Sequence, residues 1–250
     1  MPRVKSANDL AGKGGVKCAI YSDAGGGKTL LAATAPRPLV IMVEKTGADS
    51  LTTENIKRVY GDQKKITYDV PVIEAHTVEQ FDEAVNFVRE SKDYDTIIVD
   101  SMSELSKIRL KDELPHHKNA MQAYGVLAQE MDDMVREMRD DDKNWVFLFH
   151  KGREDTYDED GEKSGTQYVP DFEGQKMNHD FPYLIGDIYF IDVDPDDESG
   201  NPARRLRTAK GDTAYLAKNR RGGLDILEDM HLGKIFWKLK KKKSTRIKKK

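Results

Sequence analysis

A glycine-rich turn between an apolar strand and a helix start carries the clearest chemical signal in the chain. The segment CAIYSDAGGGKTLLAATAP has the order that a phosphate-binding loop requires. Its glycines let backbone N–H groups approach phosphate oxygens, Lys28 reaches the β- and γ-phosphates, and the Thr29 hydroxyl can bind Mg²⁺. The residues expected to contact the nucleotide are Ser22, Asp23, Ala24, Gly25, Gly26, Gly27, Lys28, Thr29 and Leu30. This spacing predicts a site for a nucleoside triphosphate, with ATP and Mg²⁺ as the expected ligands.

One position of this loop departs from the usual pattern. Ser22 stands where G-x-x-x-x-G-K-[ST] has its first glycine. Serine is small, so the departure concerns the geometry of the loop more than the class of ligand. The alternative interpretation of Gly25–Gly27 is a flexible linker, but the preceding strand and the following helix start favour a phosphate loop.

Two carboxylates end strand-like runs downstream of the loop. Asp100 follows the apolar run Thr96–Val99 and precedes Ser101, and a carboxylate at such a strand end can hold Mg²⁺ beside Thr29. Glu44 ends the run PLVIMVE and is a candidate general base, which must lie within hydrogen-bond reach of the attacking water. An ordinary surface glutamate is the alternative for Glu44.

Three more polar residues are candidates for the same site. His150 ends the run WVFLFH and is a candidate sensor of the γ-phosphate, with a structural histidine as the alternative. Lys218 and Arg220 lie in YLAKNRRGG and are candidates for stabilising charge on the transferring phosphoryl group, within one subunit or across an interface. From the residues alone, we interpret this segment as an ordinary basic turn.

The elements that must position these residues alternate along the chain. Short apolar runs rich in Val and Ile, typical of buried parallel strands, are Val16–Tyr21, Leu39–Val43, Val70–Ile73, Thr96–Val99, Trp145–Phe149 and Ile185–Val193. Helical patterns lie between them at Val78–Arg89, where Thr77 and Gln80 form a capping box, and at Tyr124–Met138. The alternation predicts an α/β fold with a doubly wound, mostly parallel central sheet, which gathers ligands at the carboxyl ends of its strands.

Two acidic segments interrupt the alternation. Residues 152–180 are expected to form a hairpin or mobile loop inserted after a core strand. An acidic turn separates Ile188–Val193 from Ala203–Thr208, which predicts an antiparallel hairpin near the C-terminus. The expected division of the chain is an N-terminal segment at 1–14, one core domain at 15–233 that contains the insertion, and a basic tail at 234–250.

The charge of the chain is distributed unevenly. The formal net charge is -3, but residues 234–250 hold ten Lys or Arg and no acid, which leaves about -13 on the remainder. A cationic arm of this kind can neutralise phosphates on nucleic acid, and a merely solvated end is the alternative. With no apolar run near the roughly 18 residues of a membrane span and no signal-peptide core, a cytoplasmic protein without a membrane partner is expected.

Taken in order, these motifs resemble the RecA-like P-loop ATPases, in particular the Sak-type single-strand annealing group of bacteriophage recombination proteins. The resemblance extends over roughly residues 16–225 and rests on SDAGGGKT, the strand-end Glu44, TIIVDS, FLFH and AKNRRGG. The last segment is similar to the KNRFG motif of the bacterial RadA recombination ATPases, with Arg221 in place of phenylalanine.

The resemblance implies a RecA-like fold and a DNA-dependent ATPase that uses ATP and Mg²⁺ in recombination or single-strand annealing. It implies that Glu44 is catalytic, that His150 is a polar sensor, and that Lys218 and Arg220 reach the nucleotide of a neighbouring subunit in a ring or filament. The expected partners are single-stranded DNA and a phage single-strand binding protein, in a bacterial host cell. The alternatives are a helicase or helicase-loader ATPase and a nucleotide-binding scaffold that does not hydrolyse ATP.

Overall fold

The computed structural model describes residues 4, 6, 14–194, 203–211 and 214–245. Most of the expected N-terminal segment at 1–14, most of the acidic turn before Ala203, and the last part of the basic tail at 246–250 lie outside these residues. No helix of the described part is long and apolar enough to cross a membrane.

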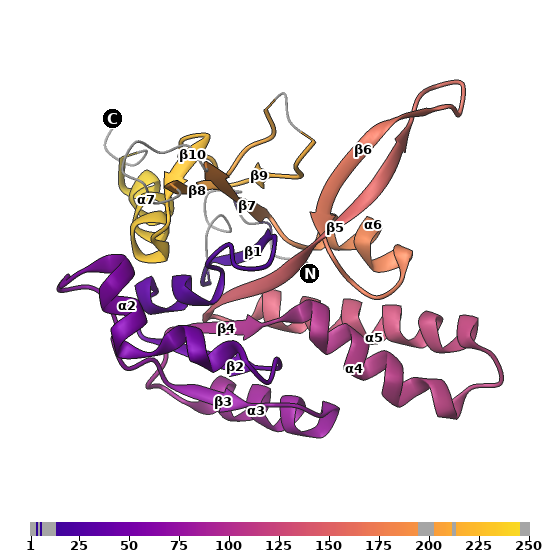
Figure 1. Ribbon diagram of the computed structural model, residues 1–250, viewed down its shortest axis with the longest axis horizontal. Coiled ribbons are helices and arrows are strands. Elements are labelled where there is room, and N and C mark those ends of the chain that lie inside the picture. Colours follow the sequence, from indigo (N-terminus) through magenta and orange to yellow (C-terminus); the bar gives the residue numbers. More distant parts are fainter. Residues whose placement is uncertain (1–3, 5, 7–13, 195–202, 212–213, 246–250) are drawn as a thin grey trace.

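A ten-stranded sheet forms the centre of the structure (Figure 1). Its main path is β10-β8-β7-β1-β5-β4-β2-β3, with β6 paired to β5 and β9 paired to β7. The parallel strands are β1 (Lys17–Ser22), β2 (Pro38–Met42), β3 (Val72–Glu74), β4 (Thr96–Asp100), β5 (Asn144–Tyr157) and β7 (Asp187–Asp194). The antiparallel strands are β6 (Lys163–Pro170), β8 (Ala203–Arg207), β9 (Lys218–Asn219) and β10 (Leu227–Asp229). The predicted mostly parallel sheet with a C-terminal antiparallel hairpin, β7–β8, is confirmed.

Helices cover both faces of this sheet, because neighbouring residues of a strand point to opposite sides. In β1, Ala19 and Tyr21 join the core under α3 (Val78–Glu90), α4 (Met102–Glu113), α5 (Ala120–Asp140) and α6 (Gln175–Leu184). Cys18 and Ile20 join the second core, under η1 (Thr29–Thr34), η2 (Gly47–Leu51), α2 (Thr53–Tyr60) and α7 (Leu232–Thr245). A short turn, η3 (Leu114–His116), follows α4. The doubly wound arrangement predicted from the alternation is therefore present.

Local sequence signals set the helix boundaries. At the start of α3 the Thr77 side chain accepts a hydrogen bond from the Gln80 N–H at 3.3 Å. The Gln80 side chain in turn accepts one from the N–H of His76 at 2.9 Å, one residue earlier than a standard capping box would place it. The predicted helix at Tyr124–Met138 is longer, because Asn119 caps its N-terminus through a 3.0 Å bond from the Gln122 N–H.

The helix expected after the phosphate loop is short. It is a single six-residue 3₁₀ element, η1, instead of an α-helix. Ala35 is extended, with φ -78° and ψ 150°, the conformation that a residue before a proline favours. Pro36 therefore ends the helix early and leads the chain into β2.

The segment at 152–180 forms a hairpin, followed by α6. β5 is fourteen residues long, and its second half pairs with β6 in antiparallel register from Lys151 opposite Pro170 to Tyr157 opposite Lys163. Figure 1 shows this hairpin projecting away from the body of the molecule. The first half of β5 is buried in the sheet, so the arm continues directly from a core strand.

The expected boundary between core and basic tail falls inside α7. This helix begins at Leu232 and buries Leu232, Ile235, Phe236 and Leu239 in the core beside η1. These residues recur every three or four positions and form one apolar face. The many lysines of the segment make this pattern hard to recognise from composition alone. The basic segment is thus in part a packed helix.

Replacing Phe236 with alanine should lower the free energy of unfolding by about 3 to 5 kcal/mol, because Phe236 is 2% exposed and its removal leaves a cavity. Its neighbour Trp237 is 59% exposed, so Trp237→Ala is the matched control and should have little effect. Denaturant unfolding of both variants tests this. Equal stabilities would show that α7 is not part of the core.

Candidate active site

The carboxyl ends of adjacent parallel strands bring four candidate residues to one edge of the sheet. In the register, Ser22 of β1 lies opposite His150 of β5, and Asp100 of β4 lies opposite Leu148 of β5. Glu44 follows β2, whose last residue lies opposite Asp100, and the N–H groups of Val43 and Glu44 both donate to the Asp100 carbonyl. Residues far apart in the sequence therefore meet at this edge.

The phosphate loop turns through two glycines with positive φ, Gly25 at +75° and Gly27 at +92°. Gly26 lies against Ser22, because a β-carbon on Gly26 would lie 2.4 Å from the Ser22 Oγ. The Ser22 hydroxyl donates to the carbonyl of Asp23 at 2.8 Å. Serine is thus accommodated at the first position of the loop, provided that Gly26 has no side chain.

Lys28 lies across this loop. Its ammonium donates to the Ser22 carbonyl at 3.2 Å, the Ser22 Oγ at 3.1 Å and the Asp23 carbonyl at 3.1 Å. Burial lowers the pKa of Lys28, while the negative charges of Asp100 and Glu44 act in the opposite direction. A partly desolvated cation held across the loop by these acceptors is suited to bind phosphate oxygens.

Asp100 and Thr29 form a pair of oxygen ligands. The Thr29 Oγ1 donates to the Asp100 Oδ2 at 2.6 Å. Asp100 is only 3% exposed, and burial raises its pKa to about 6. Oxygen atoms are the donors that Mg²⁺ prefers, and this ion is usually held by one or two protein groups together with substrate phosphates. The pair fits a magnesium ion that is completed by a nucleotide; the described residues contain no cluster of three or more His, Cys, Asp or Glu that would hold a metal alone.

Glu44 is held by two hydrogen bonds to the same carboxylate oxygen. Its Oε1 accepts from the Ser101 Oγ at 2.6 Å and from the His150 Nε2 at 2.8 Å. The hydrogen bond from His150, together with the one from Ser101, outweighs burial and lowers the pKa of Glu44 to about 2. Glu44 is therefore ionised at neutral pH, and the described residues leave its Oε2 without a hydrogen-bond partner.

His150 is fixed between β5 and α4. Its backbone N–H donates to the Ser103 Oγ at 3.0 Å, and its Nε2 must carry the proton, because a carboxylate can only accept. Ser101 and Lys151 were not predicted as site residues. The Lys151 ammonium pairs with the Asp23 carboxylate at 2.6 Å and so ties β5 to the phosphate loop; its position directly after His150 was its only sequence signal.

Lys218 and Arg220 are not brought to the phosphate loop of their own chain. β9 pairs with the beginning of β7, where Asp187 lies opposite Asn219, and this part of β7 lies beside Cys18 near the beginning of β1. The Lys218 ammonium donates to the Pro182 carbonyl, and Arg220 is exposed. The KNR segment therefore occupies the edge of the sheet opposite the site.

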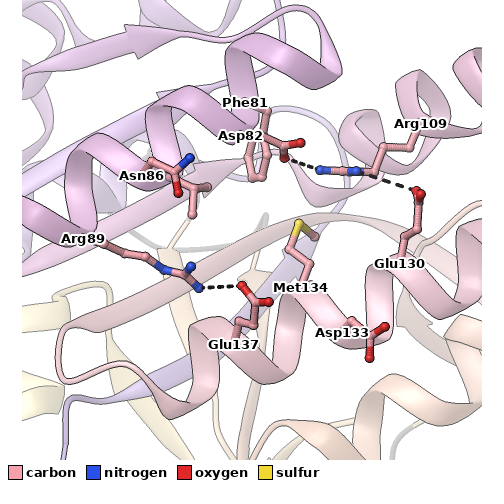
Figure 2. A pocket seen from close by; sticks show the side chains of 10 residues that line it. Phe81, Asp82, Asn86, Arg89, Arg109, Glu130, Asp133, Met134 and Glu137 are labelled. Atoms are coloured by element: carbon pink, nitrogen blue, oxygen red, sulfur yellow. Dashed lines mark hydrogen bonds and ion pairs between the residues drawn. The ribbon is translucent and has the colours of Figure 1, made fainter.

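A separate cavity of about 340 Å³ lies between α3, α4 and α5 (Figure 2). Arg109 pairs there with Asp82 at 2.5 Å and with Glu130 at 3.7 Å, and Arg89 pairs with Glu137 at 3.1 Å. The two arginines thus pair with three of the four carboxylates that line the cavity, across the contacts between the helices. None of the predicted site residues lines it, and we interpret it as a structural junction.

Comparison with known proteins gives a family and a structural similarity. The AAA domain family matches residues 14–221, which include the phosphate loop, Glu44, Asp100, His150 and the KNR segment. Among solved structures, the chain is similar to a KaiC-like protein from the hyperthermophilic archaeon Pyrococcus horikoshii OT3, with 9% identity, 77% of each chain covered and a TM-score of 0.42. No curated protein matches the sequence.

Replacing Asp100 with asparagine should stabilise the nucleotide-free protein at pH 7. Burial raises the pKa of Asp100 from 3.8 to about 6, so between these pH values the folded state keeps a proton that the unfolded state has released. At pH 7 the folded state therefore holds a buried carboxylate, which Asp100→Asn would replace with a neutral amide. The contribution of the Asp100 carboxyl to the free energy of unfolding is fully present below about pH 4. It is lost as the pH rises through 6, by up to about 3 kcal/mol.

Denaturant unfolding between pH 4 and 7, without nucleotide or magnesium, tests this expectation. The advantage of Asp100→Asn over the parent chain should grow across this range. Parallel pH profiles for the two proteins would contradict it.

Proposed function

The chain belongs to the AAA domain family, with a RecA-like P-loop NTPase fold, and we propose that it is an ATPase, stimulated by single-stranded DNA, that acts in recombination or strand annealing. The family and the phosphate loop support ATP binding. The observation that carries hydrolysis is the fixed position of Glu44, which Ser101 and His150 hold beside the Asp100–Thr29 pair. The proposed role of the protein in DNA metabolism rests on the motif resemblance and on the basic helix described below.

The residues of the site divide the work of hydrolysis. Lys28 and the backbone N–H groups of the loop bind the phosphates, and Thr29 with Asp100 would hold Mg²⁺. When bound, the ion supplies charge neutralisation on the phosphate oxygens. Glu44 is ionised, so its Oε2 can accept a hydrogen bond from the attacking water and orient it for attack. His150 keeps Glu44 in place and can respond to the γ-phosphate.

The position of the KNR segment supports self-association. Lys218 and Arg220 lie on the edge of the sheet opposite the phosphate loop, so they serve a nucleotide only if the amino edge of one subunit meets the carboxyl edge of the next. Repetition of such a head-to-tail contact gives a ring or a filament. We propose that Arg220, which is exposed, completes the neighbouring site by stabilising charge on the transferred phosphoryl group.

The outer face of α7 supports contact with single-stranded DNA. Trp237, Lys240 and Lys241 are exposed, and the Lys241 ammonium lies 4.5 Å from the centre of the Trp237 ring. An aromatic ring beside cations provides the stacking and phosphate contacts that bind single strands without sequence preference. Lys234 and Lys238 of the same helix pair with Asp229 and Glu228.

Glu44→Gln should reduce ATP hydrolysis by on the order of 10² to 10⁴ while ATP binding is retained, because the amide keeps the shape of the side chain but orients water poorly. Hydrolysis is measured with and without single-stranded DNA, and Lys28→Ala controls for contaminating activity. Stimulation by DNA in the parent chain supports the proposal. Low hydrolysis that neither DNA nor Glu44→Gln changes, despite binding of ATP, would instead indicate a scaffold.

Replacing Lys240 and Lys241 together with glutamine should weaken binding to single-stranded DNA and make it less dependent on salt. The slope of log affinity against log salt should become shallower by about 1.4, or about 0.7 for each phosphate that a lysine no longer neutralises. Lys234→Gln is the matched control, because it removes one lysine from the start of the same helix. An unchanged slope in the double variant would place the DNA elsewhere.

A further inference from the structure

Arg204 lies directly beside the phosphate loop, although neither the motifs nor the resemblance include it. It stands opposite Val193 in the β7–β8 pair, near the carboxyl end of β7 and hence at the edge of the sheet that carries the loop. A β-carbon on Gly27 would lie 3.6 Å from the Cδ and 3.9 Å from the Nε of Arg204. The side chain therefore reaches the last glycine before Lys28.

The direction of Arg204 follows from the alternation of β8. Leu206, two residues later, is fully buried in the core that also contains Leu31 and Ala32 of η1. Residues two apart in a strand point to the same face, so Arg204 lies on the face covered by η1. Arg205 points to the other face. On the face covered by η1, the Arg204 side chain therefore reaches Gly27 of the loop.

Arg204 differs from the arginines next to it in its contacts with the described residues. Arg205 pairs with Asp229, and Arg207 pairs with Asp192 at 2.5 Å. Within the described part of the chain, Arg204 has no carboxylate partner, and its side chain is exposed. Its charge does act on the half-buried Tyr60 hydroxyl, where it opposes the rise in pKa that burial causes. The Arg204 charge is thus within electrostatic reach of Tyr60, while its side chain lies beside Gly27 of the loop.

The strand order indicates which part of a nucleotide would meet Arg204. Glu44, Asp100 and His150 belong to strands on one side of β1, whereas Arg204 belongs to β8 on the other side. The γ-phosphate must face Glu44, so the α-phosphate and the nucleoside extend toward β8. The methyl group of Met230 would lie 3.9 Å from a β-carbon on Gly27 and, together with Tyr60, adds apolar surface beside Arg204.

We propose that Arg204 is a nucleotide-binding residue that contacts the α-phosphate of the bound nucleoside triphosphate. A guanidinium donates two parallel hydrogen bonds to phosphate oxygens, and here it has no competing carboxylate among the described residues. This inference rests on the proposed nucleotide site but concerns its opposite end. Because the α-phosphate is present before and after hydrolysis, the contact stabilises ATP and ADP alike.

Direct titration of the full-length chain tests this, with Mg²⁺ and either ADP or a non-hydrolysable ATP analogue as the probe. Arg204→Ala should weaken the binding of both nucleotides by about tenfold, the effect expected for one charge-assisted contact at an exposed site. Arg205→Ala is the matched control, because it removes the same charge one residue away on the opposite face. The affinity of Arg204→Lys for both nucleotides should lie between those of Arg204→Ala and Arg205→Ala, since lysine keeps the charge but lacks the planar guanidinium.

The outcomes separate this inference from the proposed function. Binding that survives Lys28→Ala unchanged would overturn the nucleotide site itself. If Lys28→Ala abolishes binding but Arg204→Ala and Arg205→Ala bind equally well, the site stands and the role of Arg204 is wrong. If Arg204→Ala weakens binding of the ATP analogue but not of ADP, Arg204 contacts the γ-phosphate, and the assignment to the α-phosphate is also overturned. Equal melting temperatures for Arg204→Ala and the parent chain, both without ligand, would show that the change in affinity is not due to misfolding.

Discussion

The parallel pairing of β5 with β1 on one side and β4 on the other decides where every polar group of the site lies. It aligns Ser22 with His150 and Asp100 with Leu148. The strand is buried from Asn144 to Phe149, so a one-residue slip would move aromatic side chains between the two cores. Such a slip would be costly, and the register is therefore fixed by packing far from the chemistry. Glu44, Asp100 and His150 meet because hydrophobic residues below them specify that register.

The same edge places two carboxylates in opposite environments. Asp100 is buried with one hydroxyl partner, which raises its pKa to about 6, whereas Glu44 accepts two hydrogen bonds, which lower its pKa to about 2. Two acids whose environments separate their pKa values usually have separate roles. Asp100 gains most from a nearby cation, as a metal ligand does, and Glu44 stays charged without one. The electrostatics thus agree with the division of work between metal binding and water orientation.

Features encoded by adjacent residues were predictable, and features that depend on distant packing were not. The end of β4 at Asp100 follows from a short apolar run, as predicted. By contrast, β5 does not end at His150 but continues to Tyr157, because its second half pairs with β6 outside the core. The early end of η1 needed the effect of Pro36 on Ala35, and the extent of α7 was hidden among lysines. Arg204 has no local signal at all, because its proximity to Gly27 depends on how β8 pairs with β7. The roles of Lys218 and Arg220 remain predictions, since a single chain does not contain the contact they need.

The packing of α7 also joins the proposed DNA-binding face to the nucleotide site. The N–H of Leu232, at the start of α7, donates to the Thr34 Oγ1 at 2.9 Å, and a β-carbon on Gly233 would lie 2.9 Å from the Thr34 carbonyl. Thr34 ends η1, and η1 begins at Thr29, the partner of Asp100. Because η1 has only six residues and is buried over most of its length, it has little room to absorb a shift of α7. A displacement of the helix at one end would therefore reach Thr29 at the other, which gives the proposed stimulation by DNA a short physical route.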